Sequence, residues 1–272
     1  MSAAAPPPVS APPPKTTPAA PAAPSPRPRP RVRELHDSGT IRKESVDADR
    51  WVATGLIKVT GDANLGEGKL DGTVSLGGRL SATRVQYRGV FDVDAAVEAS
   101  ESLSGVGSLR VGSTVHTATA DLKGTVRVSG ALTVDRALTV HGSLVAPSAT
   151  VGELSLEGDA RIPGDLVALR VDAYLKENSS FARVRARSVT LRAKPPNLVE
   201  KVFFRRVSVS VARIEADEVE LEAVEAKFVR APKITLGREA HVTEYEGTIV
   251  KRHPSSRVGF ESKSPPPYGL RR

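Results

Sequence analysis

The sequence predicts an all-β protein, a single-stranded parallel β-helix (β-solenoid) with triangular turns of about 17 residues between disordered N- and C-terminal tails. Two observations predict it. Glycines recur every 16 to 18 residues, and the same apolar positions follow each of them. The glycines are Gly55, Gly72, Gly89, Gly107, Gly124, Gly142 and Gly158. A loose repeat of this length is typical of one turn of a solenoid.

Three columns of apolar residues emerge when the units are aligned on this glycine. Two positions after it stand Ile57, Val74, Phe91, Leu109, Val126, Leu144 and Ala160. Four positions after it stand Val59, Leu76, Val93, Val111, Val128, Ala146 and Ile162. Eight positions after it stand Ala63, Leu80, Val97, Val115, Leu132, Thr150 and Leu166. Only Thr150 is polar, and Val151 beside it suggests a shift of one residue. The residues between the first two columns are mostly polar, so each unit contains a strand with one buried face.

A third apolar set in each unit completes three short strands per turn. Examples are Val85 with Tyr87 and Leu138 with Val140. Glycine at one corner permits the positive φ that the bend needs. Successive turns of such a helix stack about 4.8 Å apart through backbone hydrogen bonds. Because only the inward residues stack on one another, the outward residues are free to vary.

The second half keeps the alternation but loses the glycines, since 17 of the 22 glycines lie between residues 51 and 172. Segment 213–228 also fits a charged helix, but the two-residue period of its neighbours favours strands. Residues 192–201, RAKPPNLVEK, are expected to form a loop. We therefore expect regular turns over 55–173, less regular charged turns over 174–250, and roughly 11 or 12 turns in all.

Composition sets the predicted domain boundaries. Residues 1–30 hold 12 of the 21 prolines, mixed with Ala, Ser and Thr, and this composition cannot bury a core. We expect a disordered Pro-rich tail over 1–48, the β-helix over 49–250 and a disordered basic tail over 251–272.

Composition also bears on the compartment. The chain has no cysteine, which excludes a disulfide framework and a thiolate metal site. The first residues lack the apolar region of a secretory signal, and no stretch approaches 18 apolar residues. We therefore expect a cytoplasmic protein.

The histidines do not form a catalytic or metal-binding pattern. His116 is expected on an outward column with Asn64, Ser81, Glu98 and Thr133, where no second histidine stacks beside it. We therefore expect no metal site, no cofactor and no enzymatic activity. The enzymatic alternative is a hexapeptide-type acyltransferase, which also has turns of about 18 residues. That class needs a strict six-residue aliphatic step, whereas the apolar columns here come in pairs two residues apart.

The chain resembles the bactofilins, a family of polymer-forming cytoskeletal proteins. The resemblance covers roughly residues 51–250. It rests on GTVSLGGRLSA (72–82), GTVRVSGALTV (124–134) and GSLVAPSATVGELSLEGDARIPG (142–164), and residues 215–247 look like the C-terminal part of longer members. The resemblance implies a scaffold that assembles end to end into nucleotide-independent filaments and recruits partners through its tails.

The fold itself also favours end-to-end assembly into a homopolymer. The end turns of a β-helix present unpaired N–H and C=O groups, which are a template for another chain. We expect the polymer interface to use Leu56, Ile57 and Val59 on the first turn, and Val242, Tyr245 and Ile249 on the last. The alternative is a β-solenoid binding module that does not polymerise.

Basic residues are the candidate partner-binding groups. Two alternating sets stand out: Arg27, Arg29, Arg31 and Arg33 in the tail, and Arg183, Arg185 and Arg187 in an expected strand. Rows of this kind, repeated along a filament, would bind multivalently. We expect an acidic protein partner first, then anionic lipid, then nucleic acid, because the tail lacks an apolar membrane wedge and aromatics are scarce. In the alternative, these arginines only keep the filament soluble, or pair with the acidic stretch 215–225 in a neighbouring turn.

Overall fold

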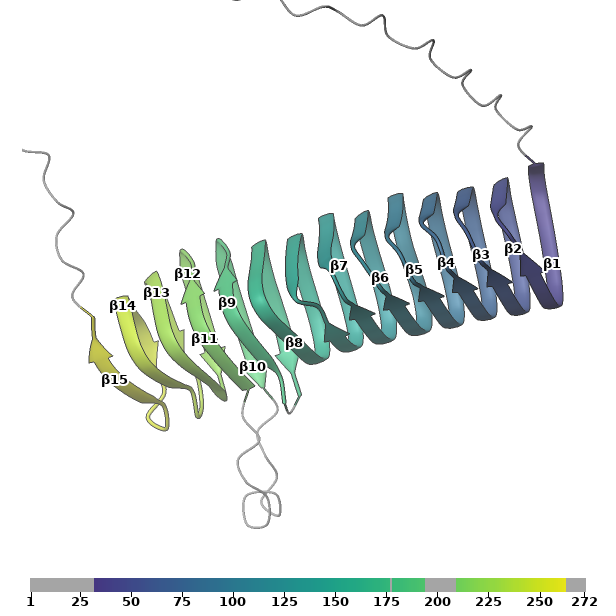
Figure 1. The fold of residues 1–272 in the computed structure, drawn as a ribbon. Helices are drawn as coiled ribbons and strands as arrows, with labels where there is room; N and C mark the ends of the chain where they lie inside the picture. The colour runs from purple at the N-terminus through teal and green to yellow at the C-terminus, as the bar shows by residue number, and fades with distance from the viewer. Residues whose placement is uncertain (1–31, 177, 194–208, 263–272) are drawn as a thin grey trace, which may run out of the picture. The chain divides into compact units, whose positions relative to one another are not determined.

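Parallel strands stack along one axis in the computed structural model (Figure 1). The chain divides into two units, residues 1–30 and 31–272. The structure describes residues 32–176, 178–193 and 209–262, all of them in the second unit. These residues confirm the predicted fold class, because they form a parallel β-solenoid of about 13 turns with about 17 residues in each.

The 15 strands form one continuous ladder. Strands β1 to β8 each pair with the next, and beyond β8 most turns are divided between two strands. Their bounds are β1 (Val32–Lys43), β2 (Val46–Val59), β3 (Ala63–Leu76), β4 (Leu80–Val93), β5 (Val97–Val111), β6 (Val115–Val128), β7 (Ala131–Val145), β8 (Ser148–Leu175), β9 (Ser180–Arg185), β10 (Ser188–Ala193), β11 (Val209–Glu215), β12 (Glu218–Glu222), β13 (Val224–Leu236), β14 (His241–Arg252) and β15 (Arg257–Glu261).

The predicted apolar columns form the core. Every residue in the first two columns is buried. The ladder pairs the first column from Ile57 to Ala160, and the second from Val59 to Val128, with their counterparts one turn away. The third column needs one correction at Thr150, which is exposed. The ladder sets Ala149 opposite Leu132, so Ala149 is the column member, and Val151 belongs beside Val134. Alanine was overlooked because its small side chain gives a weak apolar signal.

The glycine corner is confirmed at all seven predicted positions, where φ lies between +104° and +141°. Close stacking adds a second requirement. A Cβ at Gly124 would lie 2.1 Å from the carbonyl oxygen of Gly107 in the preceding turn. In the second half the ladder brings Ala223 to this corner, with a φ of 55°. Glycine is therefore needed at these corners for two reasons, the positive φ of the bend and the close contact with the preceding turn.

The predicted limits of the β-helix, at residues 49 and 250, are wrong. The described ladder runs from Val32 to Glu261 and contains about 13 turns, not 11 or 12. Gly39 pairs with Gly55 and starts the glycine column one turn earlier than predicted. The first turn was missed because two of its inward positions hold charged residues, which hide the apolar alternation.

The charged second half is made of strands, as predicted. Val219 and Leu221 of β12 are buried, which fits the two-residue period and not a helix. Of the predicted loop over 192–201, Arg192 and Ala193 end β10, and residues 194–201 lie outside the described part of the chain.

Tyr87 is a polar defect in this core. Its side chain is buried, its ring centroid lies 5.7 Å from that of Phe91, and its hydroxyl has no hydrogen-bond partner among the described residues. Gly105 in the next turn leaves room for the ring, since a Cβ there would lie 2.3 Å from it. Burial raises the pKa of Tyr87 to about 12.

We expect Tyr87→Phe to stabilise the fold by about 1 kcal/mol at neutral pH, because it removes an unsatisfied buried hydroxyl. The gain should grow in alkali. An unfolded tyrosine ionises near pH 10, so the wild type loses stability as the pH rises from about 10 to 12. Urea unfolding of both proteins at pH 7 and pH 11 measures this. If the wild type and Tyr87→Phe were equally stable at pH 7 and also at pH 11, the Tyr87 hydroxyl would not be an unsatisfied buried group.

Candidate functional site

At the N-terminal end, β1 is the first turn of the described solenoid. The pairing of β1 with β2 sets Leu35 over Trp51, Asp37 over Ala53, Ile41 over Ile57 and Lys43 over Val59. All four residues of β2 are fully buried. The outermost layer of the core therefore alternates two apolar residues with one acid and one base.

Asp37 and Lys43 form an ion pair in this outermost layer. Lys43 Nζ lies 3.1 Å from Asp37 Oδ1, with the side chains 25% and 7% exposed respectively. The buried indole of Trp51 donates a hydrogen bond from Nε1 to Asp37 Oδ2 at 2.8 Å. Both carboxylate oxygens thus have a partner, which a buried charge requires. We call Asp37, Lys43 and Trp51 the polar cap.

The C-terminal end is more apolar. Strand β15 covers only the first part of β14, from His241 to Tyr245. Tyr245, Ile249 and Val258 are partly buried and pack against the core, and no described strand lies beyond Ile249. Phe260 on β15 is 62% exposed. Among the described residues, no strand pairs with the second half of β14, and partly exposed apolar side chains lie beside it.

The structure corrects the predicted polymer interface. Ile57 and Val59 lie in the second turn, fully buried beneath β1, and Leu56 is exposed on the side of the solenoid. At the other end, Val242 is buried under Val258 of β15. Tyr245 and Ile249 do lie in the last turns. The prediction took the second described turn for the first, because it placed the start of the β-helix at residue 49.

The predicted basic row does not form a single outward row. Arg183 and Arg185 lie on β9, but Arg187 lies in the bend after it. Arg183 and Arg185 approach Asp165 at 3.8 Å and 3.9 Å, and Arg185 Nε is 3.2 Å from Glu215 Oε2. Of the tail set, Arg33 is exposed on β1, and Arg27, Arg29 and Arg31 lie outside the described residues.

Glu215 is the acidic centre of this cluster. Its partial burial alone would raise its pKa, but the hydrogen bond from Arg213 and the charges of Arg213, Arg185 and Arg183 hold the pKa below its usual range. The Arg213 guanidinium also lies 4.6 Å from the ring centroid of Phe228. The geometry thus matches the second interpretation of these arginines, in which they pair with acids of the neighbouring turns.

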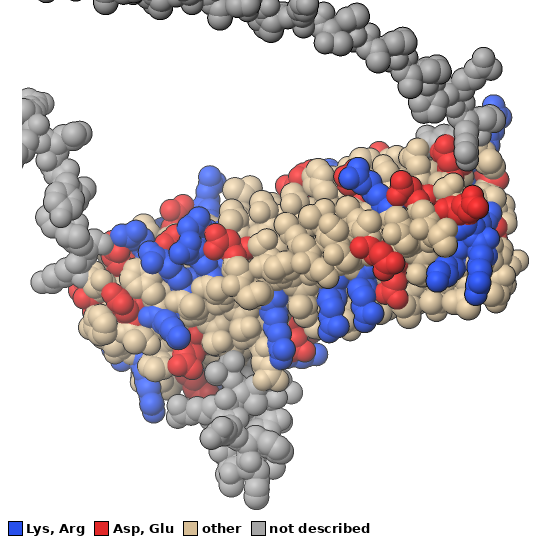
Figure 2. Space-filling model, in the orientation of Figure 1, with Lys and Arg blue, Asp and Glu red and all other residues tan. Residues whose placement is uncertain are grey.

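Charges of both signs are interspersed on the surface, especially towards the two ends of the face in Figure 2. One outward column alternates Glu34, Arg50, Glu67 and Arg84 in successive turns. Arg50 Nη1 lies 3.2 Å from Glu34 and Arg50 Nε 3.8 Å from Glu67. Each exposed pair contributes less than about 1 kcal/mol, but the alternation favours the correct register between turns.

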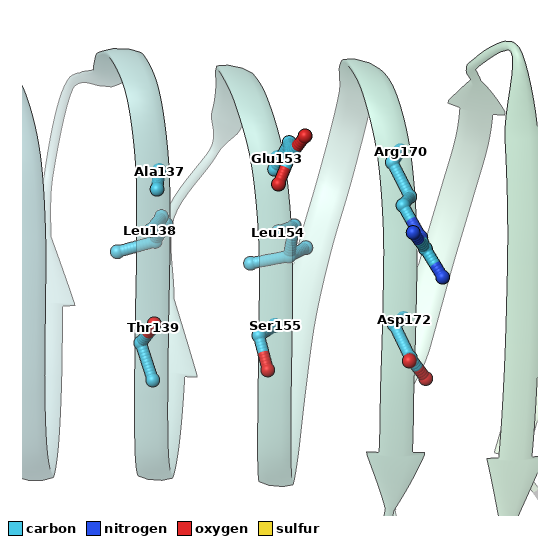
Figure 3. Close-up of a pocket in the computed structure, with 8 residues that line it drawn as sticks. All are labelled: Ala137, Leu138, Thr139, Glu153, Leu154, Ser155, Arg170 and Asp172. Atoms are coloured by element: carbon cyan, nitrogen blue, oxygen red, sulfur yellow. The ribbon is translucent and has the colours of Figure 1, made fainter.

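The middle turns carry a shallow hollow of about 230 Å³ (Figure 3). Two rows of outward residues border it, Ala137, Glu153 and Arg170 in one and Thr139, Ser155 and Asp172 in the other. The described part of the chain contains no group of three or more residues placed to hold a metal ion, and no helix that could span a membrane.

His116 lies on the predicted outward column, between Glu98 and Thr133. Its Nε2 is 3.2 Å from Asp135, and both side chains are more than half exposed. This is a surface ion pair, available only when the histidine is protonated.

Comparison with known proteins gives no match to a family model, to a curated protein or to a solved structure. The site is therefore defined by its geometry.

The polar cap is the main feature that sequence reasoning missed. A signal for it exists, since Gly39 stands 16 residues before Gly55. Extending the columns by that step places Asp37 and Lys43 at inward positions. Two charges of opposite sign at inward positions of one turn indicate a terminal turn, where the core meets solvent.

Proposed function

We propose that this protein is a structural scaffold that self-assembles through the ends of its β-solenoid into nucleotide-independent filaments. The observation that carries the proposal is the C-terminal end of the described solenoid, where Ile249 is only partly buried and no described strand pairs with the second half of β14. A second chain on this edge would continue the backbone ladder and cover apolar surface in one step. The resemblance of residues 51–250 to bactofilins supports the same function.

Recruitment of other proteins is the second part of the proposal. It rests on the sequence of the flanking segments, where Arg27, Arg29 and Arg31 stand. Many copies held in a filament would turn weak contacts into strong attachment. The solenoid arginines contribute less, because Arg183 and Arg185 have acidic neighbours.

A specific observation favours a second candidate, a solenoid binding module that does not polymerise. Inward-pointing charges are one way in which natural proteins protect an open sheet edge. Asp37 and Lys43 fit that description at the N-terminal end. The two candidates differ in one measurable property, which is the mass of the particle in solution.

We expect Ile249→Arg to leave a folded β protein that sediments as much smaller particles than the wild type. The new charge would be buried without a partner at the joint, which is costly. Val250→Arg is the matched control, because Val250 is 62% exposed and is the residue skipped by the ladder. Sedimentation velocity and far-UV circular dichroism of the three proteins measure assembly and folding. An Ile249→Arg variant that assembles like the control would remove this end from the interface.

A further inference from the structure

One outward column of the solenoid differs from the others in its charge pattern. Two outward columns alternate acids with bases, one from Glu34 to Arg84 and one from Arg185 to Glu246, and ion pairs connect several of their turns. The column at the third position after each corner glycine instead holds five bases and one acid between β1 and β8. Its members are Arg42, Lys58, Ser75, Asp92, Arg110, Arg127, Val145 and Arg161.

Arg110 and Arg127 stack directly on each other in this column. Like charges directly opposite on strands about 4.8 Å apart are destabilising. Both side chains are exposed, and no ion pair among the described residues includes either of them. Where two arginines stack elsewhere, at Arg183 and Arg213, each has an acidic partner. The repulsion between Arg110 and Arg127 is therefore not relieved within the described structure.

The basic run continues on the same face to Arg161. Val145 separates Arg161 from Arg127, and Arg161 is exposed and has no ion pair with any described acid. Asp92 precedes Arg110 without forming an ion pair with it, and it ends the run on the β4 side. We call Arg110, Arg127 and Arg161 the arginine column. It covers three steps of the ladder, which is about 14 Å.

A row of hydroxyl side chains lies beside the arginine column. Ser108, Thr125 and Ser143 each follow a corner glycine, and the ladder pairs them with one another. We call these three residues the hydroxyl row. Asp159 ends it in the turn of Arg161. Guanidinium groups only donate hydrogen bonds, whereas hydroxyls donate and accept them. This face therefore offers donors for carboxylates next to groups that can bind a peptide backbone.

We propose that the arginine column docks an extended acidic segment of another protein, with carboxylates at alternate residues. The inference rests on the proposed recruitment of proteins and adds a site on the solenoid itself. Alternate side chains of an extended chain lie about 6.6 Å apart, so three of them span about 13 Å, close to the length of the column. Guanidinium groups bind carboxylates through paired, charge-assisted hydrogen bonds.

The segments outside the described solenoid are not suited to be the occupant. Residues 1–31 and 263–272 contain no Asp or Glu, and residues 194–208 contain only Glu200. An acidic segment with three alternating carboxylates must therefore come from a different protein.

Nucleic acid and anionic lipid fit this face less well. Proteins that bind single strands stack the bases on aromatic side chains, and neither the arginine column nor the hydroxyl row contains one. The backbone of a duplex winds away from a straight row of charges, so few of its phosphates would meet the column. A membrane site usually adds an exposed apolar wedge, whereas Val145 between the arginines is half-buried.

Fluorescence anisotropy at low salt tests the site with a labelled peptide in which three glutamates alternate with threonines. We expect the full-length double variant Arg110→Ser, Arg127→Ser to bind this peptide about tenfold more weakly than the wild type, because two charged contacts are lost. The matched control is Arg136→Ser, Arg170→Ser, which removes the same charge from two other exposed arginines. It should weaken binding by less than about twofold. A peptide of the same composition with its glutamates adjacent should bind the wild type more weakly.

Three results would overturn the site: no binding by the wild type, equal weakening by both double variants, or equal affinity for the two peptides. Tighter binding of a DNA duplex or of phosphatidylglycerol vesicles, lost in Arg110→Ser, Arg127→Ser, would overturn the choice of partner. A full-length variant with Arg27, Arg29 and Arg31 changed to Ser separates this site from the tail. If only that variant lost the peptide, the arginine column would be wrong while recruitment through the tail would stand. Sedimentation of the wild type tests self-assembly independently of all these outcomes.

Discussion

Gly124→Ala is expected to destabilise the solenoid by about 3 kcal/mol or more. Two causes act together. The φ of Gly124 is +119°, which side chains with a Cβ rarely adopt, and the new Cβ would lie 2.1 Å from the carbonyl oxygen of Gly107. That oxygen belongs to the ladder, so the clash separates two turns. Stability in a solenoid is largely the sum of contacts between neighbouring turns.

Gly39→Ala separates these two causes. Gly39 has a φ of +86°, but a Cβ there would have no heavy atom within 4 Å, because β1 is the first described turn. Only the backbone strain remains, and we expect a loss of about 1 kcal/mol. Urea unfolding of both variants, followed by circular dichroism, measures the difference. Equal losses would show that stacking of the corners contributes nothing.

Lys43→Met is expected to detach the first turn. It leaves the Asp37 carboxylate, which is 7% exposed, without its counter-charge, at a cost of about 2 kcal/mol or more. Asp37→Asn combined with Lys43→Met should restore the turn, because a neutral amide oxygen still accepts the hydrogen bond of Trp51. Only the first described turn should detach, whereas global unfolding would expose every turn.

Amide hydrogen exchange measures this detachment directly. The N–H groups of Thr60 and Gly61 donate to the carbonyl oxygens of Lys43 and Glu44. We expect their exchange to accelerate in Lys43→Met and to slow again in the double variant, while the middle turns keep their protection. Unchanged exchange at Thr60 and Gly61 in the single variant would show that the ion pair does not hold the turn.

The sequence was enough to predict the regular turns because glycine and the apolar columns act together there. A corner that needs both a positive φ and close stacking admits only glycine, so Gly55 to Gly158 mark each turn. Where Ala223 takes the corner, that mark disappears, and the two-residue period alone still identified the strands. Alanine at an inward position, as at Ala149, gives little contrast with its polar neighbours.

The ends were harder to predict for a physical reason. Core positions inside the stack must be apolar, but an end position has a neighbour on one side only and borders solvent on the other. Asp37 and Lys43 occupy inward positions of the first described turn and neutralise each other, so the apolar signal stops one turn before the described ladder does. The predicted interface followed that signal and fell on Ile57, which is fully buried.

Negative-stain electron microscopy of the full-length protein, without nucleotide and over a range of concentrations, tests the central claim most directly. A single solenoid of about 13 turns is a rod roughly 60 Å long. End-to-end assembly predicts unbranched filaments one solenoid wide whose length grows with protein concentration. Isolated rods of single-solenoid length at every concentration would contradict it.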